Sequence, residues 1–239
     1  MVRTSARAAS WYGPWMRSAS LLLTSLLAAC AVSPSPRPFE THTLVLLRTG
    51  PRTGLTKEQQ QAVFAGHMAN MQRLARAGDL LLAGPFGREK SAADLRGLFV
   101  MASPDPAEAL RLAETDPGVV EGVFRLECQT LATDHPLRPL LEAELAAEDE
   151  NARMGRKMQP GEFGRGYVLL TATDGAVAER LWHGHPKVLL FARLEGGRAM
   201  AVVDAENKQA LGSAEGLGID AAGSVSVDEW FATRRLAGR

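Results

Sequence analysis

Short, mostly apolar runs separated by helical patterns are the feature that most constrains the fold of this chain. They predict buried strands at residues 42–48, 80–83, 97–101 and 123–128. A helix is expected between the first two strands, and another between the last two. Strand, helix, two strands, helix and strand therefore follow one another over residues 41–133.

Local signals mark the ends of both helices. Thr56-Lys57-Glu58-Gln59 fits a capping box that opens the first helix, and Gly78 can end it in a left-handed conformation. Asp105 followed by Pro106 is a typical start for the second helix. Pro117 stops that helix near Thr115, because a residue before proline avoids the helical region. The resulting βαββαβ order is the ferredoxin-like pattern.

A shorter version of the same order is expected over residues 166–239. Strands are predicted at 167–173, 188–194, 198–204 and 224–230, and short helices at 176–182 and 207–213. The two middle strands form a hairpin about Glu195-Gly196-Gly197. Two interpretations stand: a degenerate repeat of the first half, or the chance alternation that many α+β domains contain.

The two halves have a use for each other. A four-stranded sheet with both helices on one face leaves an apolar face that must be covered. We therefore expect an α+β fold, with two ferredoxin-like halves packed sheet to sheet as a pseudo-dimeric barrel. A helical linker over residues 134–165 joins them, with one long amphipathic helix at 137–157. That helix either packs across the sheets or binds a partner.

The N-terminus has the pattern of an export signal. The apolar stretch at residues 19–32 is shorter than the roughly 20 residues that span a bilayer, and Arg17 precedes it. Leu27-Ala28-Ala29-Cys30 resembles the lipobox of bacterial lipoprotein precursors. The resemblance implies a signal peptide at 1–29, acylation of Cys30 and a lipidated tether at 30–40. The alternatives are a plain secretory signal with an incidental cysteine and a short buried helix. The start residue is either Met1 or Met16.

The lipobox also implies a location. Ala31 stands where an aspartate would retain the protein at the inner membrane, so we expect an anchor in the outer membrane, facing the periplasm. With Cys30 acylated, Cys128 is the one other cysteine, and no internal disulfide can form. Its apolar surroundings are typical of a small buried residue.

Composition and motifs exclude several classes of function. The chain has 27 basic and 27 acidic residues, which gives no electrostatic case for nucleic-acid binding. A phosphate-binding loop, a nucleophile elbow and zinc-spaced cysteine pairs are all absent from the sequence. We therefore expect no cofactor and no metal. The chain is expected to be a monomer or a homodimer, and its partner, apart from lipid, a small-molecule ligand.

Residues 42–132 resemble the YCII-related family of small, dimeric, ferredoxin-like proteins. The resemblance rests on His67 in the first helix, on Ala83-Gly84-Pro85 after a leucine-rich strand, and on the segment Asp116-Pro117-Gly118-Val119-Val120-Glu121-Gly122-Val123. It implies that His67 and Asp116 form a catalytic His–Asp pair in a cleft. Gly84 and Pro85 either line this cleft with backbone groups, as ligand-binding residues, or simply turn the chain.

Physical reasoning supports two interpretations of this pair. His67 lies on the apolar stripe with Val63, Phe64, Met71 and Leu74, so its ring points inward, where Asp116 can orient it as a general acid or base. Alternatively, His67 is a core residue and Asp116 a helix stop. In the second half, Leu217 stands opposite Asp116 when Gly223 is aligned on Gly122, so one such site is expected.

Other charged or ligand-type residues give weaker signals. His183-Gly184-His185 hints at a metal but is more typical of an exposed turn, and Arg88 with Lys90 can attract an anion. Two function hypotheses follow. The first is a membrane-anchored protein that performs acid/base, lyase-like chemistry on a small organic molecule. The second is a non-catalytic periplasmic lipoprotein that binds a ligand or acts as a scaffold.

Overall fold

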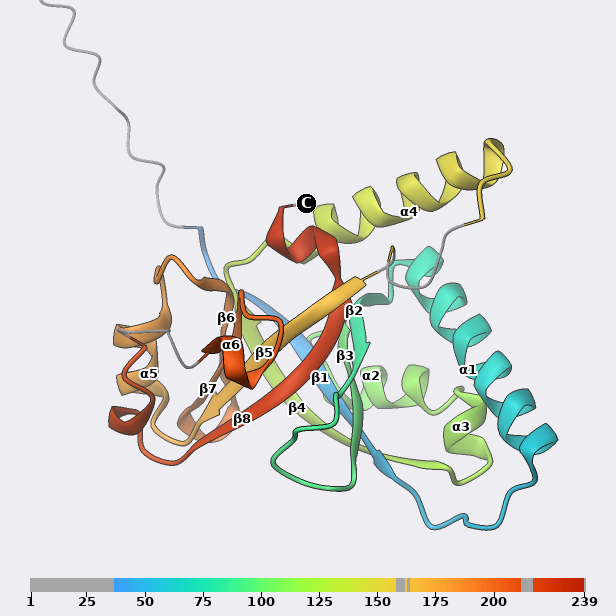
Figure 1. Ribbon diagram of the computed structural model, residues 1–239, viewed down its shortest axis with the longest axis horizontal. Helices are drawn as coiled ribbons and strands as arrows, with labels where there is room; N and C mark the ends of the chain where they lie inside the picture. The colour runs from blue at the N-terminus through green and yellow to red at the C-terminus, as the bar shows by residue number, and fades with distance from the viewer. Residues whose placement is uncertain (1–36, 158–161, 163, 212–216, 239) are drawn as a thin grey trace, which may run out of the picture. The chain divides into compact units, whose positions relative to one another are not determined.

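The computed structural model describes residues 37–157, 162, 164–211 and 217–238 (Figure 1). Residues 37–239 form one compact unit. The predicted signal peptide, Cys30 and most of the tether lie outside the described residues, so the lipid anchor stays a prediction. Among the described helices, none combines the length and the apolar character needed to cross a bilayer.

Eight strands of the described residues form one antiparallel sheet with the order β2-β3-β1-β4-β6-β7-β5-β8. Their bounds are β1 Glu40–Thr49, β2 Leu80–Pro85, β3 Leu95–Met101, β4 Phe124–Thr133, β5 Gly164–Ala172, β6 Val188–Leu194, β7 Arg198–Val203 and β8 Val225–Thr233. Antiparallel pairing of β4 with β6 joins the first four strands to the last four. The strands thus form one continuous sheet, where two separate sheets were expected.

The two edges of this sheet meet, so that it nearly closes into a barrel. Phe86, just after β2, forms a bridge with Trp230 of β8. The Gly87 N–H donates to the Glu229 carbonyl at 2.7 Å, and the Trp230 indole donates to the Gly84 carbonyl at 3.0 Å. β8 therefore lies against β2, although 146 positions separate Gly84 from Trp230 in the sequence.

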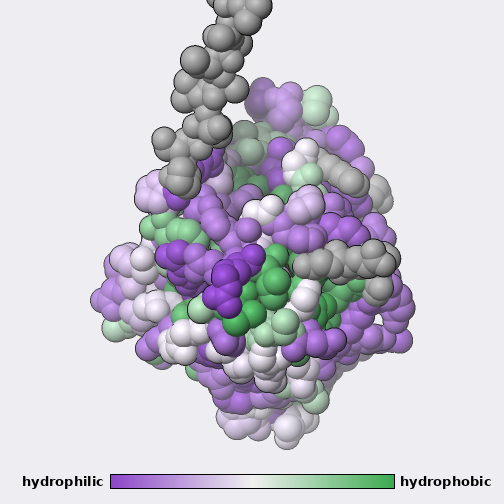
Figure 2. Space-filling model, turned by 90° about the vertical axis from the view of Figure 1, so that its left-hand side faces the viewer, coloured by the Kyte–Doolittle hydropathy of each residue, from purple (hydrophilic) through white to green (hydrophobic). Residues whose placement is uncertain are grey.

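Helices surround the sheet. Their bounds are α1 Lys57–Ala77, α2 Pro106–Ala113, α3 Pro117–Val120, α4 Leu137–Arg153, α5 Gly175–Trp182 and α6 Lys208–Leu211, with single turns at Glu195–Gly197, Ile219–Ala221 and Arg234–Ala237. In Figure 1, α1, α2 and α3 lie on one side of the sheet and α5 lies on the opposite side. Viewed from the side of α5, polar side chains surround a limited apolar area (Figure 2).

Alternating side chains along the strands build three apolar clusters. Leu44 and Leu169 point into the barrel, while their neighbours Val45 and Val168 point outward under the helices. Leu137 and Leu141 of α4 also belong to the inner cluster, so the first turns of this helix pack on the barrel interior. Both predicted caps of α1 are present: the Thr56–Gln59 capping box and a left-handed Gly78.

The last four strands follow the same order as the first four. In each group of four, the second strand along the chain comes first in the sheet, followed by the third, the first and the fourth: β2-β3-β1-β4 and then β6-β7-β5-β8. In both groups, the residue just after the first strand also donates a backbone hydrogen bond to the residue just before the last strand. The Gly50 N–H donates to the Val123 carbonyl at 2.7 Å, and the Thr173 N–H donates to the Ser224 carbonyl at 3.1 Å. Two residues before each last strand, Gly122 and Gly223 both have positive φ, +70° and +75°.

Several predicted boundaries are corrected by the structure. The linker helix ends at Arg153, where 157 was expected. β3 begins at Leu95, because Leu95 still pairs with Arg48 of β1, and β4 continues to Thr133, because it pairs along the full length of β1. Of the short helix expected at 207–213, residues 208–211 are helical, and 212 and 213 lie outside the described residues.

Candidate functional site

His67 and Asp116 meet across two elements. His67 lies in the middle of α1, and Asp116 is the N-cap residue of the one-turn helix α3. The distance from His67 Nδ1 to Asp116 Oδ2 is 2.7 Å, which is a hydrogen bond. Gly66 allows this approach, because a Cβ there would lie 2.9 Å from Pro117 Cγ.

The Asp116 carboxylate is fully buried and both of its oxygens are used. Oδ1 accepts the Gly118 N–H at 2.8 Å, and Oδ2 faces the His67 ring. Asp116 is the N-cap residue of α3, which opens with Pro117 at its first position.

Aromatic rings hold the imidazole in place. The Phe99 ring is stacked on it at 6.0 Å between centroids and 17° between planes, and the Phe124 ring packs edge-on at 5.4 Å. The His67 side chain is 13% exposed. Its orientation is thus fixed by packing on two sides and by the carboxylate on a third.

The hydrogen bond to a carboxylate indicates which ring nitrogen carries the proton in the neutral imidazole. Nδ1 donates to Asp116, which leaves a lone pair on Nε2. Among the described residues, Nε2 has no hydrogen-bond partner. His67 lines a cavity of about 760 Å³, within the usual size range of small-molecule sites. The arrangement can therefore offer a proton acceptor to a bound molecule.

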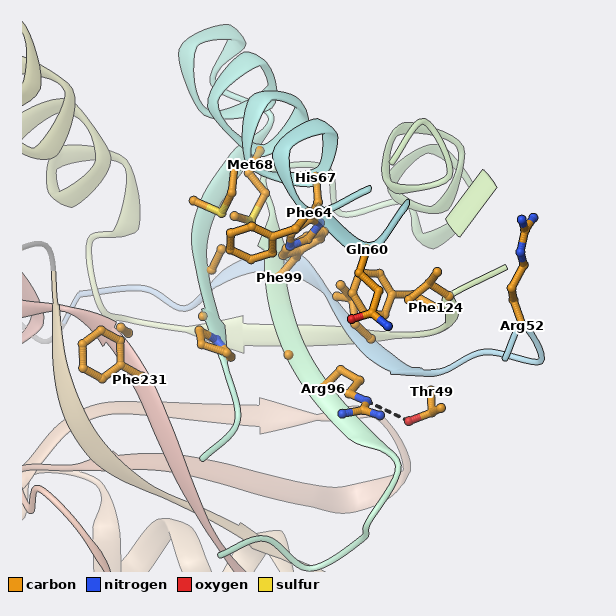
Figure 3. A pocket seen from close by; sticks show the side chains of 18 of the residues that line it. Thr49, Arg52, Gln60, Phe64, His67, Met68, Arg96, Phe99, Phe124 and Phe231 are labelled. Carbon is orange, nitrogen blue, oxygen red and sulfur yellow. Dashed lines mark hydrogen bonds between the residues drawn. The ribbon is translucent and has the colours of Figure 1, made fainter. Parts of the chain in front are cut away.

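This cavity lies between α1 and the seam of the barrel. Its floor comes from β1, β2, β3 and the start of β4, and its further wall comes from β5 and β8. Figure 3 shows Phe64, His67 and Met68 reaching from α1 toward the strands. The remaining lining residues are Leu47, Thr49, Arg52, Thr53, Gly54, Leu55, Gln60, Met71, Ala83, Gly84, Pro85, Arg96, Gly97, Phe99, Val123, Phe124, Gly164, Phe231, Ala232 and Thr233.

The N-terminal half of α1 stands over the cavity and does not pack in the core. Phe64 is 64% exposed and Met68 is 47% exposed, whereas Leu74, three turns further on from Phe64, is fully buried. The apolar stripe that predicted a core-facing helix is thus split into two parts. Its first part lines the cavity and its second part packs on the sheet.

Gly84 and Pro85, the two predicted ligand-binding residues, both lie in the cavity lining. The Gly84 carbonyl accepts the Trp230 indole N–H, so it serves the barrel seam. A Cβ on Gly84 would lie 2.0 Å from the Phe231 carbonyl oxygen. The absence of a side chain at this position is therefore required by the close approach of β8.

The structure separates the other candidate residues from this cavity. Lys90 donates to the Leu95 carbonyl at 2.6 Å, and neither Lys90 nor Arg88 belongs to the lining. His183 Nε2 lies 2.9 Å from Asp134 Oδ2, and His185 Nδ1 accepts the Lys187 N–H. Within the described ranges, no group of three ligand-type side chains is placed to hold a metal ion.

Two further titratable groups lie away from the cavity. Cys128 is half-buried, and burial raises the pKa of its thiol. Burial lowers the pKa of His42, whose Nε2 is buried without a hydrogen-bond partner and lies 3.8 Å from Glu40 Oε2. Neither belongs to the lining around His67.

Sequence reasoning missed three parts of the site. Arg96 lines the cavity from β3, and nothing in its local pattern distinguished it from other exposed arginines. Phe231 enters from β8 through closure of the barrel, which is a tertiary effect. Gly66, immediately before His67, was a readable signal, because a glycine inside a helix often marks a close contact.

Comparison with known proteins assigns the segment that carries this site. Residues 42–127 match the model of the YCII-related domain. This segment is a YCII-related domain. The match runs from β1 into β4 and contains His67, Gly84, Pro85 and Asp116. No curated protein and no solved structure is significantly similar to the chain.

Beyond the YCII-related segment, the described residue that the sequence alignment pairs with Asp116 is apolar. Leu217, opposite Asp116 in the alignment of Gly223 with Gly122, is fully buried. It packs in the apolar cluster under α5, and the Trp182 indole donates to its carbonyl at 2.8 Å. Apolar packing therefore occupies this position in the second half.

Proposed function

We propose that the protein carries out general acid/base chemistry on a small organic molecule bound beside His67. The observation that carries this proposal is the 2.7 Å hydrogen bond between His67 Nδ1 and the buried Asp116 carboxylate. His67 also lines a cavity of about 760 Å³. A base oriented by a carboxylate in an apolar site is a recurring arrangement for proton transfer.

The reaction would be a lyase-like elimination or a proton exchange. The Nε2 lone pair takes a proton from a C–H bond of the ligand, and the electron pair of that bond forms a new double bond as the leaving group departs with its own pair. The imidazolium that results is stabilised by the negative charge of Asp116. It then returns the proton to the leaving group or to water.

The proposal is tested by proton exchange in D₂O. A panel of small carbonyl compounds with acidic α-hydrogens is incubated with the protein, and loss of the C–H signal is followed by ¹H NMR. We expect His67→Asn to lower the exchange rate about 10²–10⁴-fold with an unchanged unfolding midpoint. Exchange that continues at the wild-type rate in His67→Asn would contradict the role of the pair.

The same experiment distinguishes the acid/base function from the second candidate, a ligand-binding protein without turnover. That function is favoured by the exposed Phe64 and Met68, which offer binding surface without any chemistry. A compound that binds to the wild type, yet shows no exchange with the wild type or with His67→Asn, would support it.

We also propose that the compact unit consists of two ferredoxin-like halves that form a barrel like the dimers of the family. The repeated strand order and the matching Gly50 and Thr173 hydrogen bonds support this interpretation. The first half would carry the site, and the second half, with Leu217 in the place of Asp116, would cover it. Such a chain needs no second copy to complete its cavity.

The predicted lipobox adds a location to this proposal. Acylation of Cys30 would hold the compact unit at a bacterial membrane, on its periplasmic side, through the chain that precedes residue 37. Mass spectrometry of the membrane-extracted protein tests this directly. We expect a mass without residues 1–29 and with added acyl groups, and an unmodified soluble form in Cys30→Ala.

A further inference from the structure

The cavity beside His67 offers a positive charge at one end and apolar side chains along the rest. We propose that its ligand is a small organic anion with an apolar or aromatic body, and that Arg96 binds the acidic group. This inference rests on the proposed function only in taking the cavity as the ligand site. It adds the chemical class of the ligand and the residue that selects for it.

The charges of the lining have one sign. The charged side chains of the lining are Arg52 and Arg96, and none of its members is an aspartate or glutamate. Arg52 is already paired, since its Nη1 lies 2.8 Å from Glu121 Oε2. Among the described residues, no carboxylate lies within ion-pair distance of Arg96. The guanidinium of Arg96 is therefore the uncompensated charge of this cavity.

The neighbouring acids are occupied by other arginines. Asp94 is bound at 2.9 Å by Arg48 and at 2.7 Å by Arg125. Burial raises the pKa of Asp94, but these two guanidinium groups outweigh it and the pKa is lowered. Asp94 thus stays ionised and paired near neutral pH, and it is not available to neutralise Arg96.

A hydrogen bond fixes the direction of Arg96. Its Nε donates to the Thr49 hydroxyl at 2.8 Å, and that hydroxyl donates to the Asp94 carbonyl at 3.3 Å. Nη1 and Nη2 remain available to a ligand, and a guanidinium can bind a carboxylate or sulfonate through two parallel hydrogen bonds. Figure 3 shows Arg96 and Thr49 together on one side of the cavity.

The rest of the cavity suits an apolar body. Five large hydrophobic side chains are exposed in the part of the chain that is described, and three of them, Phe64, Met68 and Phe231, line this cavity. In Figure 3, Phe231 lies at the left, well apart from Arg96, and the rings of Phe64 and Phe99 lie above, beside His67. A molecule that covers these groups removes exposed apolar surface from water.

A pair of dyes that differ in one charged group tests the inference. 1-Anilinonaphthalene-8-sulfonate is an aromatic anion, and N-phenyl-1-naphthylamine has the same body without the sulfonate. Fluorescence titrations use the full chain and are repeated with residues 37–239. We expect Arg96→Gln to weaken binding of the anionic dye about tenfold and to leave binding of the neutral dye within about twofold. Added salt should weaken binding of the anionic dye and leave binding of the neutral dye unchanged.

Arg88→Gln is the matched control, because Arg88 is exposed but lies outside the cavity lining. It should bind both dyes as the wild type does. Three results would each overturn the inference: an equal loss of affinity for both dyes in Arg96→Gln, no loss of affinity for the anionic dye in that variant, or no dye binding by the wild type. The dye titrations report on Arg96 and the exchange assay reports on His67. Failure of the dye test therefore leaves the acid/base proposal standing, and failure of proton exchange leaves this inference standing.

Discussion

At the scale of single residues, the buried carboxylate of Asp116 decides which nitrogen of His67 carries the proton. The carboxylate can only accept, so the neutral imidazole keeps its proton on Nδ1 and presents a lone pair at Nε2. Phe99 and Phe124 prevent the ring from turning away. Loss of the charge should therefore change the chemistry of His67 more than it changes the fold.

Asp116→Asn tests this reasoning. Asparagine keeps an oxygen that can cap α3 through the Gly118 N–H, but it also brings an amide donor to the oxygen position that faces His67. We expect the neutral His67 to move its proton to Nε2 and proton exchange to fall by about 10²-fold or more. ¹⁵N chemical shifts of the imidazole nitrogens report the tautomer.

Wild-type protein at the same pH serves as the reference for the tautomer, and thermal unfolding serves as the control for the fold. A variant that retains the Nδ1–H tautomer while losing activity would assign Asp116 a purely electrostatic role. A variant that retains both the tautomer and full activity would remove Asp116 from the mechanism.

At the scale of elements, α1 performs two tasks along its length. Leu74 anchors its C-terminal half on the sheet, and Phe64 in its N-terminal half lines the cavity. We expect Phe64→Gln to change the free energy of unfolding by less than about 0.5 kcal/mol, because the ring is 64% exposed and glutamine suits a helix. Binding of N-phenyl-1-naphthylamine should weaken several-fold.

Leu74→Ala on the same helix is the contrast. Removal of this fully buried side chain should lower the free energy of unfolding by about 2–5 kcal/mol. Urea denaturation measures both variants. If Phe64→Gln were as destabilising as Leu74→Ala, the first half of α1 would have to be part of the core.

The elements also show what the sequence can and cannot predict. Thr56, Gly78 and Asp105 mark helix ends through short-range hydrogen bonds, so local reasoning places them correctly. Phe64 has the same local pattern as a core residue, and only the position of β2, β3 and β8 below it decides that it faces a cavity. Arg96 and Phe231 belong to the site for the same reason, because their neighbours are distant in sequence.

At the scale of the whole molecule, the cavity depends on how closely β8 approaches β2. The Trp230 indole and the Glu229 carbonyl bond to the segment at Gly84–Gly87, and β8 then supplies Phe231, Ala232 and Thr233 to the cavity wall. The site on the first four strands is thus completed by the last one. A change at this seam should alter stability and ligand binding together.

Gly84→Ala is the sharpest test of that coupling. The added Cβ would lie 2.0 Å from the Phe231 carbonyl oxygen, which is backbone and cannot rotate away, so β2 and β8 must separate. We expect a loss of about 1–3 kcal/mol in the free energy of unfolding and weaker binding of both dyes.

Gly97→Ala is the matched control, since its Cβ would lie 3.0 Å from its nearest neighbour, the Gly84 oxygen, and neither glycine has a positive φ. Gly97→Ala should lower both the free energy of unfolding and the affinity for the dyes less than Gly84→Ala does. Equal effects of the two substitutions would mean that the closeness of the β2–β8 seam does not set the shape of the cavity.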